Sequence, residues 1–146
     1  MEIFAKYFNE LTVDELYEII KLRVDVFVVE QNCVYSDLDD CDQDSIHVFG
    51  KVDGKIVAYC RIIKRGDLPH EKIGRVLSTK RRKGYATELI NKAIEVSKKE
   101  FKSEIIDIGA QVYARSLYEK IGFVAHGEEY LEDGIPHIAM SIDLSE

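Results

Sequence analysis

A run of four cations ends at a turn that could hold an anion. Lys80 begins the run, which continues through Arg81, Arg82, Lys83, Gly84, Tyr85 and Ala86. Residues 84–101 have helical periodicity, so the turn lies at a helix N-terminus. There the first backbone N–H groups have no partner within the helix, and the helix dipole favours negative charge. The glycine and the small alanine let a ligand approach the backbone. A diphosphate would suit this turn, although the spacing fits neither a Walker loop nor a G-x-G-x-x-G turn.

A second segment with chemical capacity is residues 111–123, Gln-Val-Tyr-Ala-Arg-Ser-Leu-Tyr-Glu-Lys-Ile-Gly-Phe. Tyr118 lies in the middle of a short predicted helix, residues 114–121, which Gly122 ends. This tyrosine has two interpretations. It is either an amphipathic core residue or a phenol that donates a proton, because a phenol with a pKa near ~10 is protonated at neutral pH. The segment alone does not decide between them.

The hydrophobic pattern predicts the elements that must position these two segments. Strands are expected at residues 3–8, 46–52, 55–64, 72–78, 104–109, 123–131 and 137–144, and helices at residues 16–28, 84–101 and 114–121. Thr12 and Glu15 have the spacing of a capping box before the first helix. Asp-Gly pairs at 53–54 and 133–134 predict two hairpins. This order predicts an α/β protein with three layers, in which helices flank a mixed, mostly antiparallel sheet.

The composition limits the class of protein. The chain has 146 residues, of which 46% are hydrophobic and 32% are charged, as is typical of one globular domain spanning residues 1–146. A net charge of −7 argues against a general nucleic-acid binder. No apolar run approaches the ~20 residues of a membrane helix, and the first residues lack the pattern of a signal peptide. Cys33, Cys41 and Cys60 are an odd number, so we expect reduced thiols in the cytoplasm.

The two segments together resemble the GNAT acetyltransferase superfamily. RRKGYA is similar to that family's Q/R-x-x-G-x-G/A turn, and QVYARSLYEKIGF is similar to its N-x-x-A-x-x-h-Y-x-x-x-G-F segment, in which h is apolar. A helix and a strand separate the two, as in the family, and the resemblance covers essentially the whole chain. Further residues resemble the ElaA-like branch: Leu22, Arg23, residues 26–31, Tyr35, Asp39, Asp42, His47, Ala58, Tyr59, Arg61, residues 73–76, Ala110, Gln111, residues 132–138 and Met140.

The resemblance implies the GNAT fold and acetyl transfer from acetyl-CoA to a primary amine of a small molecule or peptide. It places the CoA diphosphate on the turn at Gly84 and the pantetheine arm beside the strand that contains Val76. A backbone N–H near Val76 would stabilise the oxyanion, and Tyr118 would protonate the departing thiolate. The expected cofactor-binding residues are Val76, Leu77, Ser78, Arg81, Arg82, Lys83, Gly84, Tyr85, Ala86, Thr87, Gln111 and Tyr118.

The general base is left open by the sequence. Some relatives use a glutamate on the strand before residue 111, but Ile106 stands at that position here. Glu30 and His47 are the leading candidates, and Asp107 and His137 are weaker ones. Whether Glu30 could act as a base depends on Arg23. This arginine either extends along the apolar edge of its helix or pairs with a carboxylate such as Glu30. Such a pair would hold the glutamate ionised.

Acidic residues gather in the loop before residue 45 and near residue 132. Asp37, Asp39, Asp40, Asp42, Asp44, Glu132 and Asp133 could attract a cationic amine, or they could be a solvated surface. The spacing at residues 40–51 departs from an EF-hand at the required glycine and glutamate. The cysteine spacing does not fit a zinc site. We therefore expect no metal.

Two functions other than catalysis stay open at this level. The chain could be a non-catalytic acetyl-CoA-binding sensor or scaffold, or it could bind another phosphate ligand at the basic turn. No nucleic acid or membrane partner is expected, and either a monomer or a homodimer is compatible with the sequence. The sequence does not identify the acceptor amine.

Overall fold

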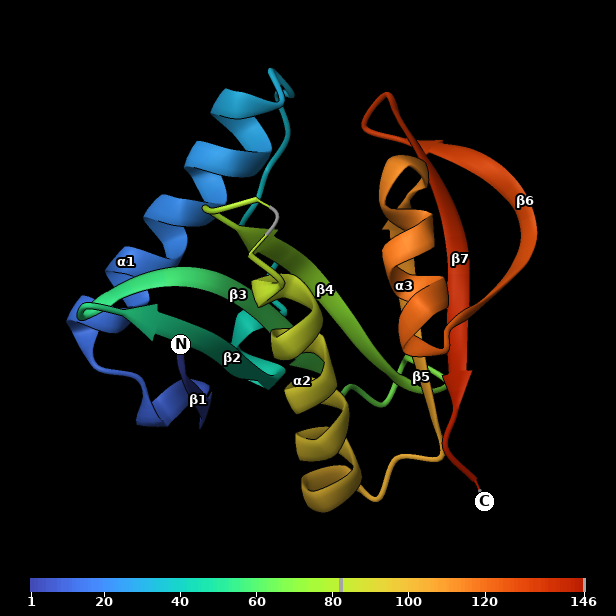
Figure 1. The fold of residues 1–146 in the computed structure, drawn as a ribbon, viewed down its shortest axis with the longest axis horizontal. Coiled ribbons are helices and arrows are strands. Elements are labelled where there is room, and N and C mark those ends of the chain that lie inside the picture. The colour runs from blue at the N-terminus through green and yellow to red at the C-terminus, as the bar shows by residue number, and fades with distance from the viewer. Residues whose placement is uncertain (82, 146) are drawn as a thin grey trace.

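A seven-stranded mixed sheet organises the chain in the computed structural model, which describes residues 1–81 and 83–145. The strand order is β1-β2-β3-β4-β5-β7-β6 (Figure 1). Neighbouring strands are antiparallel except for β4 and β5, which are parallel. This confirms the predicted α/β class with a mostly antiparallel sheet.

The observed elements lie close to the predicted ranges. The strands are β1 Glu2–Tyr7, β2 Ser45–Val52, β3 Lys55–Ile63, β4 Glu71–Ser78, β5 Ile105–Gln111, β6 Val124–Glu132 and β7 Ile135–Asp143. The helices are α1 Val13–Arg23, α2 Tyr85–Phe101 and α3 Arg115–Ile121. Short helical segments are η1 Phe8–Glu10, η2 Val24–Glu30, η3 Asp42–Asp44 and η4 Val112–Ala114. Both Asp-Gly turns join antiparallel strands, and all four turn residues have positive φ, as a type I′ turn requires.

The first helix begins as predicted but ends differently. The Thr12 hydroxyl accepts a hydrogen bond from the Glu15 N–H (3.0 Å), and the Glu15 carboxylate accepts one from the Thr12 N–H (2.9 Å). The α-helix stops at Arg23, and η2 continues as a wider π-helix. The N–H groups of Gln31 and Cys33 donate to carbonyls five residues earlier. The apolar period could not show this change, because it continues through Val28. π-Helical turns are rare and often lie at functional sites.

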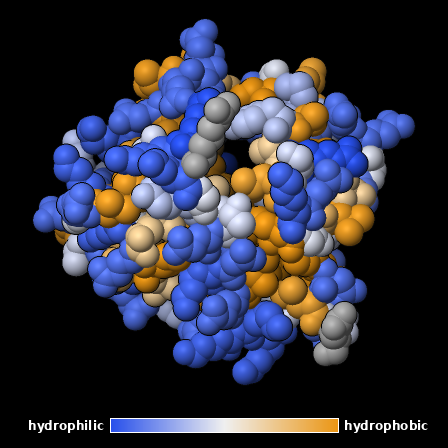
Figure 2. Space-filling view, viewed as in Figure 1, coloured by the Kyte–Doolittle hydropathy of each residue, from blue (hydrophilic) through white to orange (hydrophobic). Residues whose placement is uncertain are grey.

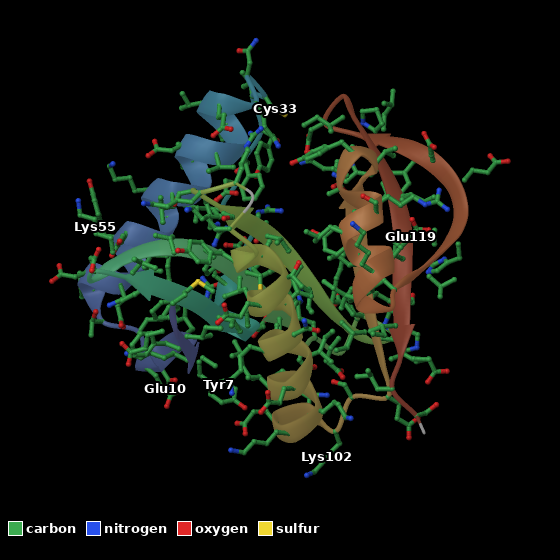
Figure 3. The ribbon with its side chains drawn as sticks, viewed as in Figure 1. Tyr7, Glu10, Cys33, Lys55, Lys102 and Glu119 are labelled. Carbon is green, nitrogen blue, oxygen red and sulfur yellow. The ribbon has the colours of Figure 1, made fainter. Side chains whose placement is uncertain are left out.

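Helices cover both faces of the sheet (Figure 1). α2 and α3 cover one face, where they bury the larger core cluster, which includes Ile73, Leu89 and Ile106. α1 covers part of the other face over a smaller cluster that includes Ile19, Phe49 and Leu77. The Tyr7 hydroxyl from β1 donates to Glu100 in the last turn of α2 at 3.1 Å (Figure 3). These contacts hold α2 against the sheet along its length, including its C-terminal end.

The middle of the sheet opens at β4 and β5. Only three residue pairs join these strands, Glu71–Ile73 of β4 with residues 106–108 of β5. β4 also contains a bulge, because one residue of β3, Cys60, lies opposite two residues of β4, Arg75 and Val76, and Arg75 has a φ of +52°. The extra residue reverses the side-chain alternation, which explains why Ile73 and Leu77 belong to opposite faces. Beyond Ile73 the two strands separate and leave space between them.

Two further properties concern the chain as a whole. No helix in the described part is long and apolar enough to cross a membrane. Cys33, Cys41 and Cys60 are free, and Cys33 and Cys60 are buried.

Candidate active site

A cleft of about 1180 Å³ lies where β4 and β5 separate. One part is lined by the first turn of α2, the end of β4 and α3. The other part is lined by the end of η2, the loop after it, and the β6–β7 turn. Figure 2 shows the surface hollowed between these halves, with apolar residues exposed along it. The cleft has a polar wall at the start of α2 and an apolar wall at α3, and it could hold an extended ligand.

The start of α2 forms a polar wall of the cleft, where backbone N–H groups could bind an anion. Gly84 precedes the helix with a φ of +72°, a conformation that glycine adopts without strain. Tyr85, Ala86 and Thr87 line the cleft, and the N–H groups of a first helical turn have no partner within the helix. Lys80 and Arg81 line the same region. Lys83 is not among the lining residues, and Arg82 lies outside the described residues.

The end of β4 forms a free edge along the cleft. The cleft is lined here by Val76, Leu77 and Ser78, and none of these residues pairs with β5. The bulge at Arg75 immediately precedes this edge and turns the strand. An extended amide-containing chain could add to such an edge through backbone hydrogen bonds. The predicted pantetheine-binding residues therefore lie together in the cleft.

Tyr118 lies on α3 at the apolar wall of the cleft. Its side chain is buried, at 6% relative exposure, and packs edge-on against Phe123, with 6.0 Å between ring centroids. Burial raises the pKa of its phenol further above neutrality. The phenol therefore stays protonated and can donate a proton to a group in the cleft. Tyr118 belongs to the core cluster and also lines the cleft, so the interpretation as a core residue is confirmed, and its role as a proton donor stays a prediction.

Polar contacts join the two sides of the cleft opening. Glu30 accepts a hydrogen bond from Arg81 at 2.8 Å, and the side-chain amides of Gln31 and Gln111 face each other at 3.3 Å. The Cys33 thiol donates to the Asp133 carbonyl at 3.4 Å. In Figure 3, Cys33 marks the end of the segment that faces the β6–β7 turn. The end of η2 and the residues that follow it thus contact the turn before α2, β5 and the β6–β7 turn around the opening.

His47, a leading candidate for the base, lies away from this opening. It is completely buried, and it is not among the residues that line the cleft. One ring nitrogen, Nδ1, lies 2.7 Å from the Tyr59 hydroxyl, and Nε2 lies 2.9 Å from the Asp42 carbonyl. Burial lowers the pKa of this histidine, although the Asp42 carbonyl opposes that shift. The structure corrects the expectation for His47, which has a structural role in the sheet.

Of the other candidate bases, His137 and Glu30 line the cleft and Asp107 does not. His137 lines the cleft, and its Nδ1 donates to the Ile135 carbonyl at 2.7 Å. A carbonyl can only accept, so in the neutral ring Nε2 is the nitrogen without a proton. It lies 3.5 Å from Glu132. Glu30 lines the cleft but is paired with Arg81.

Three arginines and three aspartates form a network beside the cleft, in which Arg23, Arg61, Asp37 and Asp42 are buried and Arg75 and Asp39 are partly accessible. Asp42 accepts from Arg23 at 2.7 Å and from Arg61 at 2.9 Å through the same oxygen. Asp37 pairs with Arg23 at 2.8 Å and with Arg75 at 2.9 Å. The remaining member, Asp39, accepts from Arg61 at 2.8 Å. The expectation that Arg23 pairs with a carboxylate is therefore confirmed, but its partners are Asp37 and Asp42 rather than Glu30. The alternative, in which Arg23 extends along the apolar edge of its helix toward solvent, is wrong, since Arg23 is fully buried.

This network changes the role of the acidic loop. Burial would raise the pKa values of Asp39 and Asp42, but the adjacent arginines lower both overall, so both carboxylates stay ionised. Asp37 and Asp42 are buried in these ion pairs and do not line the cleft, so the prediction that they attract an amine is wrong for these two residues. Among the acidic residues predicted for that role, Asp39, Glu132 and Asp133 line the cleft, and Asp39 is paired with Arg61.

Several residues around the cleft were not assigned roles from the sequence. Gln31, Cys33 and Tyr35 line it, and Tyr35 lies 5.4 Å below the Arg75 guanidinium. The unusual strand residue Arg61 offered a signal, because a charged side chain facing a core requires a buried partner. Nothing in the spacing of the loop residues indicated which aspartates would supply that partner. Across residues 1–81 and 83–145, no cluster of three His, Cys, Asp or Glu side chains could hold a metal ion.

These features define a class of protein. The separated strands β4 and β5, the bulge in β4 and the first turn of α2 meet at one cleft, and this arrangement matches the GNAT acyltransferase fold. The crystal structure of Escherichia coli ElaA superposes with a TM-score of 0.91 at 37% identity, covering 97% of this chain and 99% of that one. An acyl-CoA N-acyltransferase from Pseudomonas aeruginosa superposes with a TM-score of 0.90 at 35% identity, covering 97% and 99%.

Sequence comparison gives the same family. A family profile described as "Acetyltransferase (GNAT) domain" matches residues 15–144. UPF0039 protein C11D3.02c of Schizosaccharomyces pombe is 43% identical, over 99% of this chain and 98% of that protein. Protein ElaA of Escherichia coli is 39% identical, over 91% of this chain and 90% of that protein. The chain belongs to the GNAT family, as an ElaA-like member.

Proposed function

We propose that the whole chain is one catalytic unit that moves the acetyl group of acetyl-CoA to a primary amine. The observation that carries the proposal is the cleft itself, where the first turn of α2, the free edge of β4 and the buried Tyr118 phenol lie together. Each supplies what one part of an acyl-CoA reaction needs. A family in which acyl-CoA is the usual donor supports the choice of ligand. The free cysteines support a reducing compartment such as the cytoplasm.

The donor fits the cleft by charge and shape. N–H groups of Tyr85, Ala86 and Thr87 would hold the diphosphate, with Lys80 and Arg81 adding positive charge. Val76, Leu77 and Ser78 would pair with the amides of the pantetheine arm. Bound in this way, the thioester lies where β4 and β5 separate, near the Val76 N–H. That N–H would stabilise the negative charge that develops on the carbonyl oxygen.

Two side chains would move the protons. His137 Nε2 takes a proton from the amine as the nitrogen attacks the thioester carbon, directly or through one water. The C–S bond then breaks, and the Tyr118 hydroxyl donates its proton to the sulfur. The products are an N-acetylated amine and CoA with a neutral thiol. We favour His137 over Glu30 as the base, because Glu30 is held in an ion pair with Arg81, whereas the Ile135 carbonyl fixes the ring of His137.

The choice of base predicts different effects for two matched substitutions. His137→Gln should lower kcat about 100-fold, since a positioned base contributes about 10²–10⁴-fold. Glu30→Gln should lower kcat less than about threefold, because only a partly exposed ion pair with Arg81 is lost. Initial rates at saturating acetyl-CoA would measure both. The reverse order of effects would make Glu30 the base.

The direct test of the proposed function is acetyl-CoA-dependent release of CoA thiol with a panel of amines. The panel should contain small amines, polyamines, aminoglycosides, and peptides with free N-termini or lysines. Transfer to at least one acceptor, confirmed by the mass of the acetylated product, is the expected result. If acetyl-CoA binds but no acceptor is acetylated, the chain is a sensor or scaffold. Tighter binding of ATP or NAD than of CoA in calorimetry would contradict the choice of donor.

The diphosphate site predicts a salt-sensitive loss of binding. Arg81→Gln should weaken CoA binding about fivefold at low salt and less at high salt, because an exposed ion pair contributes up to about 1 kcal/mol and is screened. Lys98→Gln removes the same charge from the last turn of α2 and should leave the dissociation constant unchanged. Calorimetry at two salt concentrations measures both variants. Equal effects would mean that only net charge matters.

A further inference from the structure

A second, smaller cavity of about 200 Å³ adjoins the cleft, and we refer to it as the side pocket. It is lined by Leu68, Lys72, Asp107, Ile108, Gly109, His126, Tyr130, Ala139 and Met140. Four of these residues also line the cleft: Leu68, Lys72, Ile108 and Gly109. The two cavities therefore share a wall at the point where β4 and β5 begin to separate. A ligand in the cleft could extend into the side pocket there.

The shape of β6 makes room for the side pocket. Pairing between β6 and β7 is interrupted between His126 and Tyr130, and Gly127 between them has a φ of +78°. Figure 1 shows β6 bowing away from β7 over this stretch. The side chains at the two ends of the bow both line the side pocket. A Cβ added at Gly109 would lie 3.0 Å from the Tyr130 hydroxyl. A larger residue at this position would therefore crowd the wall that the two cavities share.

Charge in the side pocket comes from two neighbouring residues of opposite sign. Lys72 of β4 and Asp107 of β5 are direct partners in the parallel pair. They would be expected to pair, but the carboxylate has other partners. Oδ2 of Asp107 accepts from His70 at 3.0 Å, and Oδ1 accepts from the Ser141 hydroxyl at 2.6 Å. The Ser141 oxygen in turn accepts from His126 Nε2 at 2.9 Å. Both oxygens of Asp107 are thus occupied.

Lys72 is left without a carboxylate partner. Among the described residues, no ion pair or side-chain hydrogen bond includes it, although the preceding residue, Glu71, contacts both Lys64 and Ser103. The lysine is only partly exposed, and it lines both cavities. A half-buried ammonium group without an anion favours binding one from solution. The apolar remainder of the pocket, Leu68, Ala139 and Met140, would surround the part of the ligand next to that anion.

We propose that the acceptor amine also carries a carboxylate, and that Lys72 binds this carboxylate in the side pocket. This inference rests on the proposed acetyl transfer and specifies its acceptor as an amino acid or a related amino-carboxylate. The amine must reach the region of Val76, four residues after Lys72, which corresponds to about 13 Å of extended strand. The lysine side chain spans part of that distance. Acceptors with several bonds between amine and carboxylate should therefore fit better than glycine.

The test uses paired acceptors of increasing length, namely glycine, β-alanine, 4-aminobutyrate and 6-aminohexanoate, each against its carboxamide. For at least one length, wild type should have kcat/KM about tenfold or more higher for the carboxylate, as expected for a charge-assisted contact of about 1.5–3 kcal/mol. Lys72→Met keeps the apolar stem of the side chain and should remove this preference, mainly by lowering kcat/KM for the carboxylate. Lys72→Glu should instead favour the diamine of the same length.

A matched control separates the local contact from net charge. Lys64→Met removes one positive charge at the end of β3, from a residue that lines neither cavity, and should keep the carboxylate preference. Thermal denaturation of each variant would establish that it is folded. If wild type acetylates amines without preferring a carboxylate at any length, or if Lys72→Met keeps the preference, this inference is wrong and the proposed function stands. If no amine in the broad panel or in these series is acetylated, both are wrong.

Discussion

Tyr118→Phe should lower kcat by about 100-fold or more while leaving the dissociation constant for CoA within about twofold. A positioned acid contributes about 10²–10⁴-fold, and the substitution removes only the hydroxyl that would protonate the departing thiolate. The ring itself should stay in place, because its packing against Phe123 and the core cluster does not depend on the oxygen. Burial raises the pKa of the phenol, so wild type keeps its proton through the neutral range. Initial-rate kinetics and calorimetry provide the two measurements.

A variant elsewhere provides the control for losing a hydroxyl. Tyr17 lies on α1, is 72% exposed and does not line the cleft, so Tyr17→Phe should leave kcat unchanged. If Tyr118→Phe also keeps its full kcat, another group or water protonates the thiolate. If it loses CoA binding together with activity, Tyr118 acts by shaping the cleft. Either result would contradict the role as acid.

Local patterns predicted most of the fold, because each depends on near neighbours. The capping box at Thr12, the Asp-Gly turn at 53–54 and the amphipathic face of α2 require only residues a few positions apart. The turn at Gly84 before α2 was predictable for the same reason, and anion binding there stays a prediction. The π-helical end of η2 was not, since its apolar residues continue the period of α1 while the backbone widens.

Long-range pairing limited the prediction of the site. Arg23 and its partners Asp37 and Asp42 are 14 and 19 residues apart, and the intervening chain has little regular structure. A run of acidic residues gives the same pattern whether it faces solvent or buried arginines. His47 illustrates the same limit. A histidine on a strand can face a cleft or a core, and only the position of the loop next to it buries this one.

Asp42→Asn should lower the free energy of unfolding by about 3–5 kcal/mol, the usual result of removing one partner from a buried ion pair. One oxygen of Asp42 accepts from both Arg23 and Arg61, so the substitution leaves two buried guanidinium groups short of negative charge. Arg23 is completely buried, so water cannot replace the lost contact. Urea denaturation at neutral pH, followed by circular dichroism, measures the loss.

The same contact makes stability depend on acid pH. Burial raises the pKa of Asp42, but the hydrogen bond and charge of Arg23 outweigh burial and lower it overall. An unfolded aspartate titrates near ~3.9, so below that pH the unfolded chain binds a proton that the folded chain does not. The stabilisation is complete above about pH 4 and is lost as the pH falls toward the lowered pKa. The stability curves of wild type and Asp42→Asn should therefore converge as the solution becomes more acidic.

Asp40 offers a matched control in the same loop. It is exposed and has a φ of +63°, a conformation that asparagine tolerates as well as aspartate, so Asp40→Asn should change stability by less than about 0.5 kcal/mol. The comparison distinguishes a buried network from a general effect of acidic charge. Similar stabilities for the two variants would mean that the arginines find other partners or water. The network would then not be what holds this wall of the cleft in place.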